Sequence, residues 1–554
     1  MTGFNSPFSQ SPPPPAKDLV RRTGARGGEY LVYMSENHKI TKAATTIGVG
    51  TLLSRITGFL RDMVVAYFFG AGMATDAFLV AFRIPNLWRK LVGEGSMTVS
   101  FIPVYTEYLT QRAREDSQEV AHIAFTMAGI LLFVLTALGI IFSPVLIKMF
   151  ALTWSPTSEK FQLALTLNRI MFPYLFFVGL FALSMGILNS LRHFFAPAFA
   201  TVFLNLSIIG SVFLFYDHFR SPVMALAIGV LAGGVLQFFF QIPFLLEKKI
   251  GFQFNFNFRH PAIKRIGFLM IPGLIGTAVY QLNEVIDTMF ATSLPDGSVS
   301  YLYYAGRLME FPLGIFVIAI GTAALPSFSL LVAQGKTEEF KETVSFTFRL
   351  GSFICIPAMV GLISLRIPIL NLLLQRGEFD YFATKMTGRA LLCYSVGLWA
   401  IGGVRVLAPA FYSLQDTKTP LKVGLICLGT NVILVCIFIY PLQHSGLALA
   451  TGLSSILNLC LLYWKLNHRL GGLDAARNIK SLLGTFLCSL PMGGVAYLIC
   501  SVGDWTVSGN TIEKVLLLGT GIIVGIGVYL ASCYWMKNEE MLFLLKIVRR
   551  KLKG

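Results

Sequence analysis

The sequence predicts an all-α polytopic membrane protein of about 14 transmembrane helices, with two parallel six-helix lobes around a central cavity plus two C-terminal helices. Three observations predict this class. The 554 residues are 55% hydrophobic and only 13% charged, with a mean hydropathy of +0.68, whereas soluble domains carry roughly 25% charged residues. Apolar runs of the ~20 residues that cross a bilayer recur along the chain. Finally, landmark residues repeat at a constant spacing.

The predicted spans are apolar runs separated by short polar connections. They cover residues 43–69, 75–108, 118–143, 160–190, 195–216, 221–246, 264–293, 298–333, 343–365, 382–413, 419–440, 444–465, 479–501 and 512–536. Several are longer than a simple spanning helix and contain Pro or Gly, so we expect tilted or broken helices there.

Basic residues alternate between successive connections. Those after even-numbered spans are rich in Lys and Arg, as in residues 247–265 (EKKIGFQFNFNFRHPAIKR), whereas those after odd-numbered spans are short and poor in Lys, as in residues 69–76 (FGAGMATD). Lys and Arg are retained on the cytoplasmic side, so both termini should be cytoplasmic. The same rule explains the net charge of +17 without nucleic acid as a partner.

Composition divides the chain into five parts. Residues 1–40 are rich in Pro, Ser and Gly and predict a disordered cytoplasmic tail. The remaining parts are an N-lobe at 41–250, a C-lobe at 260–468, a final helix pair at 477–536 and a basic cytoplasmic tail at 537–554.

Sequence motifs of metal sites and soluble enzymes are absent. The eight cysteines form no CxxC pair and are typical of small buried apolar residues. The seven histidines include no pair at zinc-helix spacing, and neither a Gly-rich phosphate loop nor HExxH occurs. We therefore expect a transporter with no metal and no catalytic residue.

An internal repeat relates the two predicted lobes. Arg83 and Arg307 lie 224 residues apart in matching surroundings, and Pro197 and Pro420 lie 223 apart, each after a Ser-Leu pair. The offset equals six spans, an even number, so the two halves share one orientation. Parallel lobes are a transporter architecture, with the site expected between them.

The first span carries charges on one face. On a helix, Ser54, Arg55, Gly58, Arg61 and Asp62 fall within one sector of about 120°. A charge at mid-bilayer costs at least ~2.5–3.5 kcal/mol, and one aspartate cannot pair with both arginines locally. A polar cavity visited by an anion would offset that cost.

Other spans also contain polar residues. The second holds Asp76, Arg83, Asn86, Arg89, Lys90 and Glu94, the seventh Gln281, Asn283, Glu284 and Asp287, and the eighth Arg307 and Glu310. Because the arginine fork binds two phosphate oxygens at once, Arg55, Arg61 and Arg307 together favour a phosphate or diphosphate headgroup.

Structural roles for these charges remain open from the sequence. The three cavity arginines could form buried salt bridges with Asp62, Glu284 or Asp287 instead of binding a ligand. Arg89 and Lys90 could snorkel or pair with Glu94, and Arg83 could pair with Glu310.

The stretches SRITGFLRD, FGAGMATDAFLVAFRIPNLWRKLVGEGS, YYAGRLMEFPLG and QRGEFD resemble the MurJ/MviN lipid II flippases of the multidrug/oligosaccharidyl-lipid/polysaccharide exporter superfamily. The resemblance runs from about residue 40 to 540. It implies that lipid II, an undecaprenyl-diphosphate-linked peptidoglycan precursor, moves from the inner to the outer leaflet of the bacterial cytoplasmic membrane by alternating access. It also implies a groove beside the last two helices for the polyprenyl tail.

The resemblance assigns roles to individual residues. The family's cavity arginines match Arg55, Arg61, Arg307 and Arg89, and its other motif residues match Asp76, Asn86 and Glu94. The family's sodium site, where described, uses helices 7, 11 and 12; Asp287 is the matching residue in the seventh predicted span and Asn431 the candidate in the eleventh. Sodium, protons or the membrane potential therefore remain alternatives for the driving force.

Four rival functions follow from the same residues. A flippase for another polyprenyl-linked oligosaccharide would also use arginines, whereas a drug/cation antiporter would need a carboxylate-rich cavity. A membrane transferase would need a metal site or catalytic dyad, and a scaffold for cell-wall enzymes would leave the intramembrane charges unexplained. Besides lipid II and membrane lipids, cell-wall synthesis machinery is an expected partner. A monomer is expected, because the cavity is complete in one chain.

Overall fold

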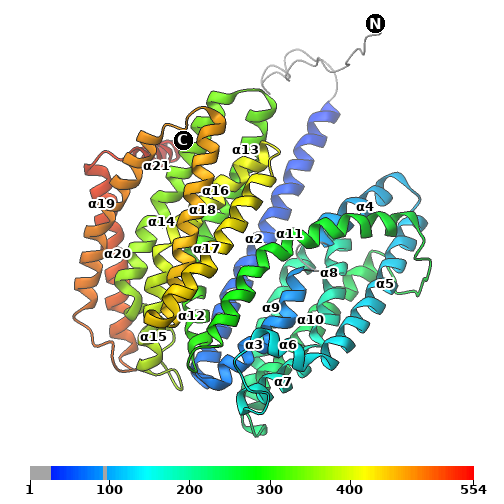
Figure 1. Cartoon of the computed structure of the whole chain (residues 1–554). Helices are drawn as coiled ribbons and strands as arrows, with labels where there is room; N and C mark the ends of the chain where they lie inside the picture. Colours follow the sequence, from blue (N-terminus) through cyan, green and yellow to red (C-terminus); the bar gives the residue numbers. More distant parts are fainter. Residues whose placement is uncertain (1–26, 92–96, 554) are drawn as a thin grey trace.

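The computed structural model describes residues 27–91 and 97–553, and in these ranges every regular element is a helix (Figure 1). The first lobe contains α2 (Gly27–Phe69), α3 (Met73–Arg89), α4 (Met97–Gln111), α5 (Arg114–Ile141), α6 (Ser143–Phe150), α7 (Glu159–Met171), α8 (Tyr174–Ser190), α9 (Phe195–Phe215), η2 (Tyr216–His218) and α10 (Met224–Glu247).

The second lobe and the C-terminal helices follow in chain order. They are α11 (Pro261–Ala291), α12 (Ser298–Pro312), η3 (Leu313–Val317), α13 (Ile318–Ala333), α14 (Thr337–Leu373), α15 (Tyr381–Val396), α16 (Leu398–Ser413), α17 (Lys418–Leu442), α18 (His444–Leu470), α19 (Ala475–Cys500), α20 (Thr511–Trp535) and α21 (Glu539–Lys553).

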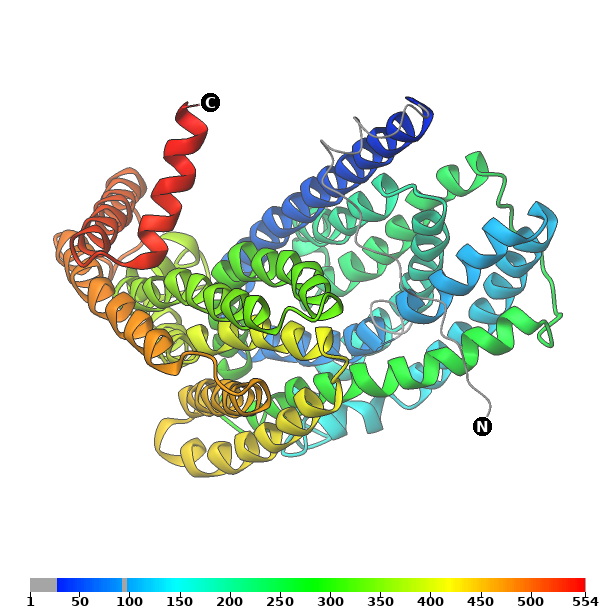
Figure 2. The same cartoon turned by 90° about the horizontal axis from the view of Figure 1, so that it is seen from above.

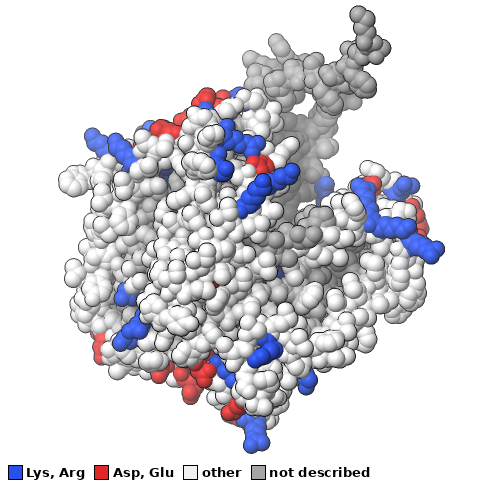
Figure 3. Space-filling model, viewed as in Figure 1, with Lys and Arg blue, Asp and Glu red and all other residues white. Residues whose placement is uncertain are grey.

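The two lobes lie side by side, and α19 and α20 pack along the far side of the second lobe against α14 (Figures 1 and 2). Helix α11 connects the lobes: it packs against α4 and α5 of the first and against α12, α17 and α18 of the second. The lobes meet at the bottom of Figure 1 and diverge toward the top, where the C-terminus lies (Figures 1 and 3). We call the bottom the closed end and the top the open end.

The predicted spans coincide with helices or with consecutive helix pairs. Nine helices in the described residues are long and apolar enough to cross a membrane, or ten if the pair α15 and α16, bent by 42°, forms one span. The remaining predicted spans fall on α2, α3–α4, α11 and α12–α13. These helices carry the predicted site residues, and the count of fourteen therefore stays a prediction.

One local feature differs from the sequence-based expectation, and a second agrees with the breaks expected at proline. Helix α2 begins at Gly27, so residues 27–40, assigned above to a disordered tail, are helical; residues 1–26 lie outside the described part. This stretch has no Pro, and a helix propagates readily from an existing one. In the eighth span, Pro312 is followed by a short π-helix, η3, consistent with the loss of a backbone donor at proline.

Candidate functional site

Five polar side chains from three helices meet between the lobes. They are Arg61 and Asp62 of α2, Asn205 of α9, and Tyr303 and Arg307 of α12. We call them the central cluster. The charged face predicted for the first span thus faces α9 within its own lobe and α12 across the gap.

Asp62 holds the central cluster together. Its Oδ1 accepts from Arg61 Nη2 at 2.7 Å and from the Tyr303 hydroxyl at 2.9 Å, while its Oδ2 accepts from Arg307 Nε at 2.9 Å. Asn205 Oδ1 in turn accepts a hydrogen bond from Arg61 Nη1 at 3.1 Å. One buried carboxylate therefore pairs with two arginines, one from each lobe, as in the salt-bridge alternative considered above.

Exposure separates the two arginines. Arg61 and Asp62 are buried, whereas the Arg307 side chain is 39% exposed and its Nη1 lies 3.9 Å from the exposed Glu310 carboxylate. The exposed part of Arg307 is accessible to an anion in the space between the lobes while its Nε stays bound to Asp62.

Arg55 lies on the same face of α2 but outside the carboxylate network. Its guanidinium rests against Gly314 in η3, where a Cβ would overlap it. Among the described residues, Arg55 has no hydrogen-bond or ion-pair partner, and the residue is exposed. Ser54 contributes its backbone carbonyl, which accepts from Asn205 Nδ2 at 3.1 Å. Arg55 therefore adds a cation that no described carboxylate neutralises.

A second polar contact joins α3 to α11. Lys90 Nζ lies 2.7 Å from Glu284 Oε1, and Arg83 donates to the Glu284 carbonyl at 3.2 Å and to the Thr288 hydroxyl. Lys90 and Arg83 thus have partners on α11, and the alternative pairing of Arg83 with Glu310 is not seen. Glu284 is accordingly engaged by Lys90 and not by the central arginines.

Asp287 lies one turn further along α11 and faces the second lobe. Its Oδ1 accepts from Asn431 Nδ2 at 3.0 Å, its Oδ2 lies 3.5 Å from the Thr451 hydroxyl, and the same Asn431 nitrogen reaches Asn283 Oδ1 at 3.0 Å. These residues come from α11, α17 and α18, the seventh, eleventh and twelfth predicted spans. The buried Asn431 Oδ1 has no hydrogen-bond partner among the described residues.

Asp76 belongs to the closed end. This buried carboxylate accepts from the backbone amides of Gly297 and Ser300 at 2.8 and 2.9 Å, from the Ser300 hydroxyl at 2.7 Å, and from Lys160 Nζ at 3.0 Å. It caps the N-terminus of α12 from the other lobe. The sequence grouped Asp76 with the substrate-binding residues, whereas here its partners all belong to the closed end.

The remaining predicted residues lie near the end of α3. Arg89 Nε donates to Asn86 Oδ1 at 2.9 Å on the same helix, and Glu94 lies outside the described residues. No group of three or more His, Cys, Asp or Glu that could hold a metal ion occurs among the residues that the structure describes.

Sequence reasoning missed several residues that complete these contacts. Asn205 was visible as an amide within an apolar span, and Tyr303 stands inside a quoted motif. Lys160 and Ser300 gave no signal, because each becomes a partner of Asp76 only through packing between distant segments.

Comparison with known proteins adds independent information. The family model described as lipid II flippase MurJ matches residues 65–515. The probable lipid II flippase MurJ of Vibrio cholerae serotype O1 is 36% identical over 507 residues, covering 89% of this chain and 95% of the relative. The lipid II flippase MurJ of Burkholderia cenocepacia is 33% identical over 500 residues, covering 89% and 97%.

Solved structures agree. A structure of lipid II flippase MurJ in an inward closed conformation matches with a TM-score of 0.74 and 28% identity, covering 89% of this chain and 99% of that chain. An inward-facing multidrug resistance MATE transporter matches with a TM-score of 0.65 at 16% identity, covering 78% and 99%. The second likeness concerns the fold alone.

Proposed function

Since this chain belongs to the MurJ family of lipid II flippases, we propose that it carries lipid II from the inner to the outer leaflet of the bacterial cytoplasmic membrane by alternating access. It is a multi-pass membrane transporter of a flippase family and not an enzyme family. The residues, the direction of transport and the transport cycle described below go beyond membership of the family.

The observation that carries the proposal is the charge balance between the lobes. Arg61 and Arg307 share the buried carboxylate of Asp62, while Arg55, on the same face of α2, lies against Gly314 of the second lobe without a carboxylate partner among the described residues. A diphosphate has enough oxygens to bind Arg55 and the exposed side of Arg307 together, and arginine binds such oxygens in pairs. Docking there would bring a ligand against both lobes at once.

The cycle then follows from differential binding. With the open end facing the cytoplasm, the diphosphate enters between the lobes and draws Arg55 of one lobe toward Arg307 of the other. A ligand shifts a conformational equilibrium only by its different affinity for the two states. The contacts of the diphosphate with both lobes strengthen as the open end closes, so binding favours the state in which that end is shut. Release then occurs at the present closed end, once the Asp76 contacts separate.

Orientation and tail path have separate support. In the view of Figure 3, Lys and Arg side chains lie at both ends of the molecule and cover more of the top, the open end, and basic residues favour the cytoplasmic side. Helices α19 and α20 expose many Leu, Ile and Val side chains, which suits a polyprenyl chain that stays in the bilayer.

For the driving force, a sodium ion fits the Asp287 group. Carboxylate, amide and hydroxyl oxygens are the donors that hard cations take, and the unpartnered Asn431 Oδ1 is such a donor. Asp287, Asn431 and Thr451 would hold the ion between α11, α17 and α18, and a bound ion would supply positive charge that fixes α11 to the second lobe. If sodium did not raise the Tm of the wild type, protons or the membrane potential would be favoured as the driving force, whereas a sodium-dependent rise that Asp287→Asn retained would exclude Asp287 as a ligand.

The test is leaflet-resolved lipid II in cells depleted of the protein and complemented with variants. An outside-acting enzyme that cleaves only exposed headgroups reports translocation. We expect Arg61→Ala and Arg307→Ala to leave lipid II accumulated and protected, and the control Arg220→Ala, at an exposed loop arginine, to leave it cleavable. Cleavable lipid II with Arg61→Ala at normal membrane abundance would exclude the proposed role of this residue.

A further inference from the structure

The connection between α10 and α11 is unusually aromatic. Residues 251–258 read GFQFNFNF, so phenylalanine alternates with glutamine or asparagine. The four rings, Phe252, Phe254, Phe256 and Phe258, are all exposed, with Phe254 at 87% and Phe256 at 65%. We call residues 251–258 the aromatic segment. Exposed apolar patches of this kind mark interaction or membrane surfaces.

The aromatic segment is fixed along the outside of α5. Arg114 and Gln118 bind the carbonyls of Lys248 and Lys249 at the start of the connection. Further on, the Asn255 amide donates to the Thr126 hydroxyl at 3.0 Å. The contact point on α5 therefore moves by twelve residues, roughly 18 Å along the helix axis, toward the apolar part of that span.

Ring contacts and a side-chain hydrogen bond fix the conformation of the segment. The Phe252 ring packs 4.9 Å from that of Phe125 on α5, and Phe254 stacks 6.4 Å from Phe256. The Asn255 side chain accepts from the Asn257 amide at 3.0 Å. The segment therefore presents its two most exposed rings outward from the lobe, beside α5, a helix long and apolar enough to cross a membrane.

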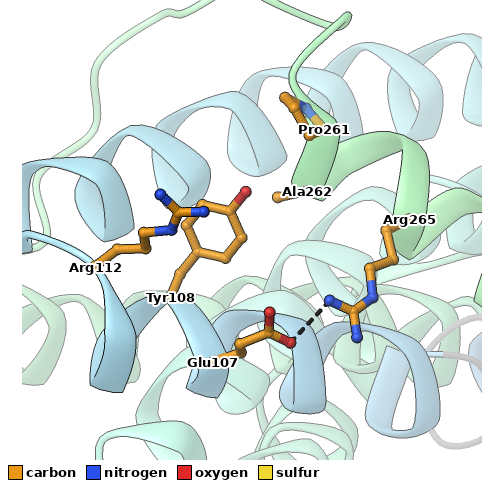
Figure 4. A pocket seen from close by; sticks show the side chains of 6 residues that line it. All are labelled: Glu107, Tyr108, Arg112, Pro261, Ala262 and Arg265. Atoms are coloured by element: carbon orange, nitrogen blue, oxygen red, sulfur yellow. Dashed lines mark hydrogen bonds and ion pairs between the residues drawn. The ribbon is translucent and has the colours of Figure 1, made fainter.

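A pocket of about 210 Å³ lies where this connection enters α11 (Figure 4). It is lined by Glu107, Tyr108, Arg112, Pro261, Ala262 and Arg265. Figure 4 shows Arg112 beside the Tyr108 ring on one side, and Arg265 with Glu107 on the other, joined at 2.8 Å. The Arg112 guanidinium has no partner among the described residues, so the pocket keeps one uncompensated cation.

We propose that this pocket holds the phosphate of an anionic phospholipid headgroup while the aromatic segment sits among the acyl chains beside it. Arg112 and Arg265 would bind phosphate oxygens, with the Tyr108 hydroxyl as a further donor. Basic groups near a bilayer surface attract anionic lipid, and exposed rings beside them gain from burial in its apolar layer.

The neighbourhood favours a lipid over a soluble anion. The connection brings both an apolar anchor and the cationic pocket to one side of the first lobe, and a soluble phosphate would use only the pocket. The inference does not depend on the central cluster or on lipid II transport. Because α11 reaches from this pocket to both lobes, a bound lipid would contact the helix that joins them.

The test is lipid retention by the detergent-purified full chain, measured by native mass spectrometry after equilibration with phosphatidylglycerol or phosphatidylcholine. We expect preferential retention of phosphatidylglycerol, and a loss of at least about fivefold in the double variant Arg112→Gln/Arg265→Gln, since each fivefold is about 1 kcal/mol. The control is the double variant Arg220→Gln/Lys336→Gln, at exposed sites elsewhere. It removes the same number of charges and should retain phosphatidylglycerol.

Two further arms decide the occupant. Phe254→Ser/Phe256→Ser should weaken retention severalfold. Phe133→Ser should not, because Phe133 is an exposed phenylalanine that lies on α5, outside the aromatic segment. Glycerol phosphate should compete poorly with the lipid. Equal retention by the double arginine variant, equal loss with Phe133→Ser, or equal competition by glycerol phosphate would each overturn the proposal. Lipid II translocation measured on the same variants keeps this outcome separate from that of the proposed function.

Discussion

Two carboxylates of the first lobe bind the second lobe, and they do so in different ways. Asp76, only 1% exposed, accepts from two backbone amides, a hydroxyl and Lys160. Asp62 is also buried but pairs with two arginines, one of which is 39% exposed. Asp76 therefore has donors that are fixed by the N-terminus of a helix, whereas Asp62 has a partner that can turn toward another anion.

This difference separates a structural contact from an exchangeable one. Backbone amides at a helix N-terminus cannot leave Asp76 unless the lobes move apart, so its contacts report the closed end. In the proposed cycle, Arg307 would exchange Asp62 for a phosphate by a side-chain rotation. A substrate headgroup would then act on the centre of the molecule while the closed end still holds.

The largest effect is expected for Asp76→Ala. Removing one partner of a buried ion pair costs about 3–5 kcal/mol, and the donors at the start of α12 would also lose their acceptor. Thermal unfolding in detergent measures the loss. Asp296→Ala is the matched control, because Asp296 binds the same Lys160 but is 60% exposed, and exposed pairs contribute at most about 1 kcal/mol. Equal losses in both variants would contradict the distinction.

A smaller loss is expected for Asp62→Asn. Hydrogen bonds to charged groups contribute about 1.5–3 kcal/mol, and the exposed Arg307 can recover some of this from water. The uncompensated arginines should then bind pyrophosphate more tightly than in the wild type. Pyrophosphate should therefore raise the Tm of Asp62→Asn more than that of the unmodified protein. An equal rise in Tm in the two proteins would contradict an exchange of Asp62 for phosphate.

Gly314→Ala tests Arg55 without removing it. A Cβ at this position would overlap the guanidinium, which can move because it is the end of a flexible side chain. We expect a three- to tenfold loss of pyrophosphate affinity, about 1 kcal/mol, at nearly unchanged Tm. Gly306→Ala in α12 has open space around its Cβ and should leave the affinity unchanged. A matching loss in both variants would point to a general effect on the helix.

The smallest effect is expected at the C-terminal helix. A hydrogen bond from Arg477 to Glu539 lowers the pKa of that carboxyl below 4.5. A lowered pKa in the folded state means that stability is present above the unfolded-state pKa and is lost as the pH falls through the folded value. Proteolysis of α21 should thus increase modestly below about pH 4.5. Glu539→Gln should remove the pH dependence, and a change near pH 7 would refute the assignment.

The sequence predicted the local part of this comparison and left the distant part open. The helical period placed Arg55, Arg61 and Asp62 on one face, and the repeat pointed to Arg307. The sequence offered Asp62 as one of three possible carboxylate partners for the arginines and gave Asp76 no donors, because those contacts depend on how α2 and α3 meet α12. The count of fourteen spans stays a prediction, because four of the predicted spans fall on α2, α3–α4, α11 and α12–α13, which are not among the nine or ten helices of the described residues that are long and apolar enough to cross a membrane.

The closed end contains one further contact whose consequence is kinetic. Gly70 and Gly377, both with positive φ, lie against backbone of the opposite lobe, and the Glu378 amide donates to the Tyr67 carbonyl at 2.9 Å. Because main-chain atoms make this seam, it carries no net charge and needs no proton or counterion to form. Any dependence of opening on ionic strength at this end should then come from the Lys160–Asp296 ion pair and not from the seam, and a side chain at either glycine would shorten the lifetime of the sealed state.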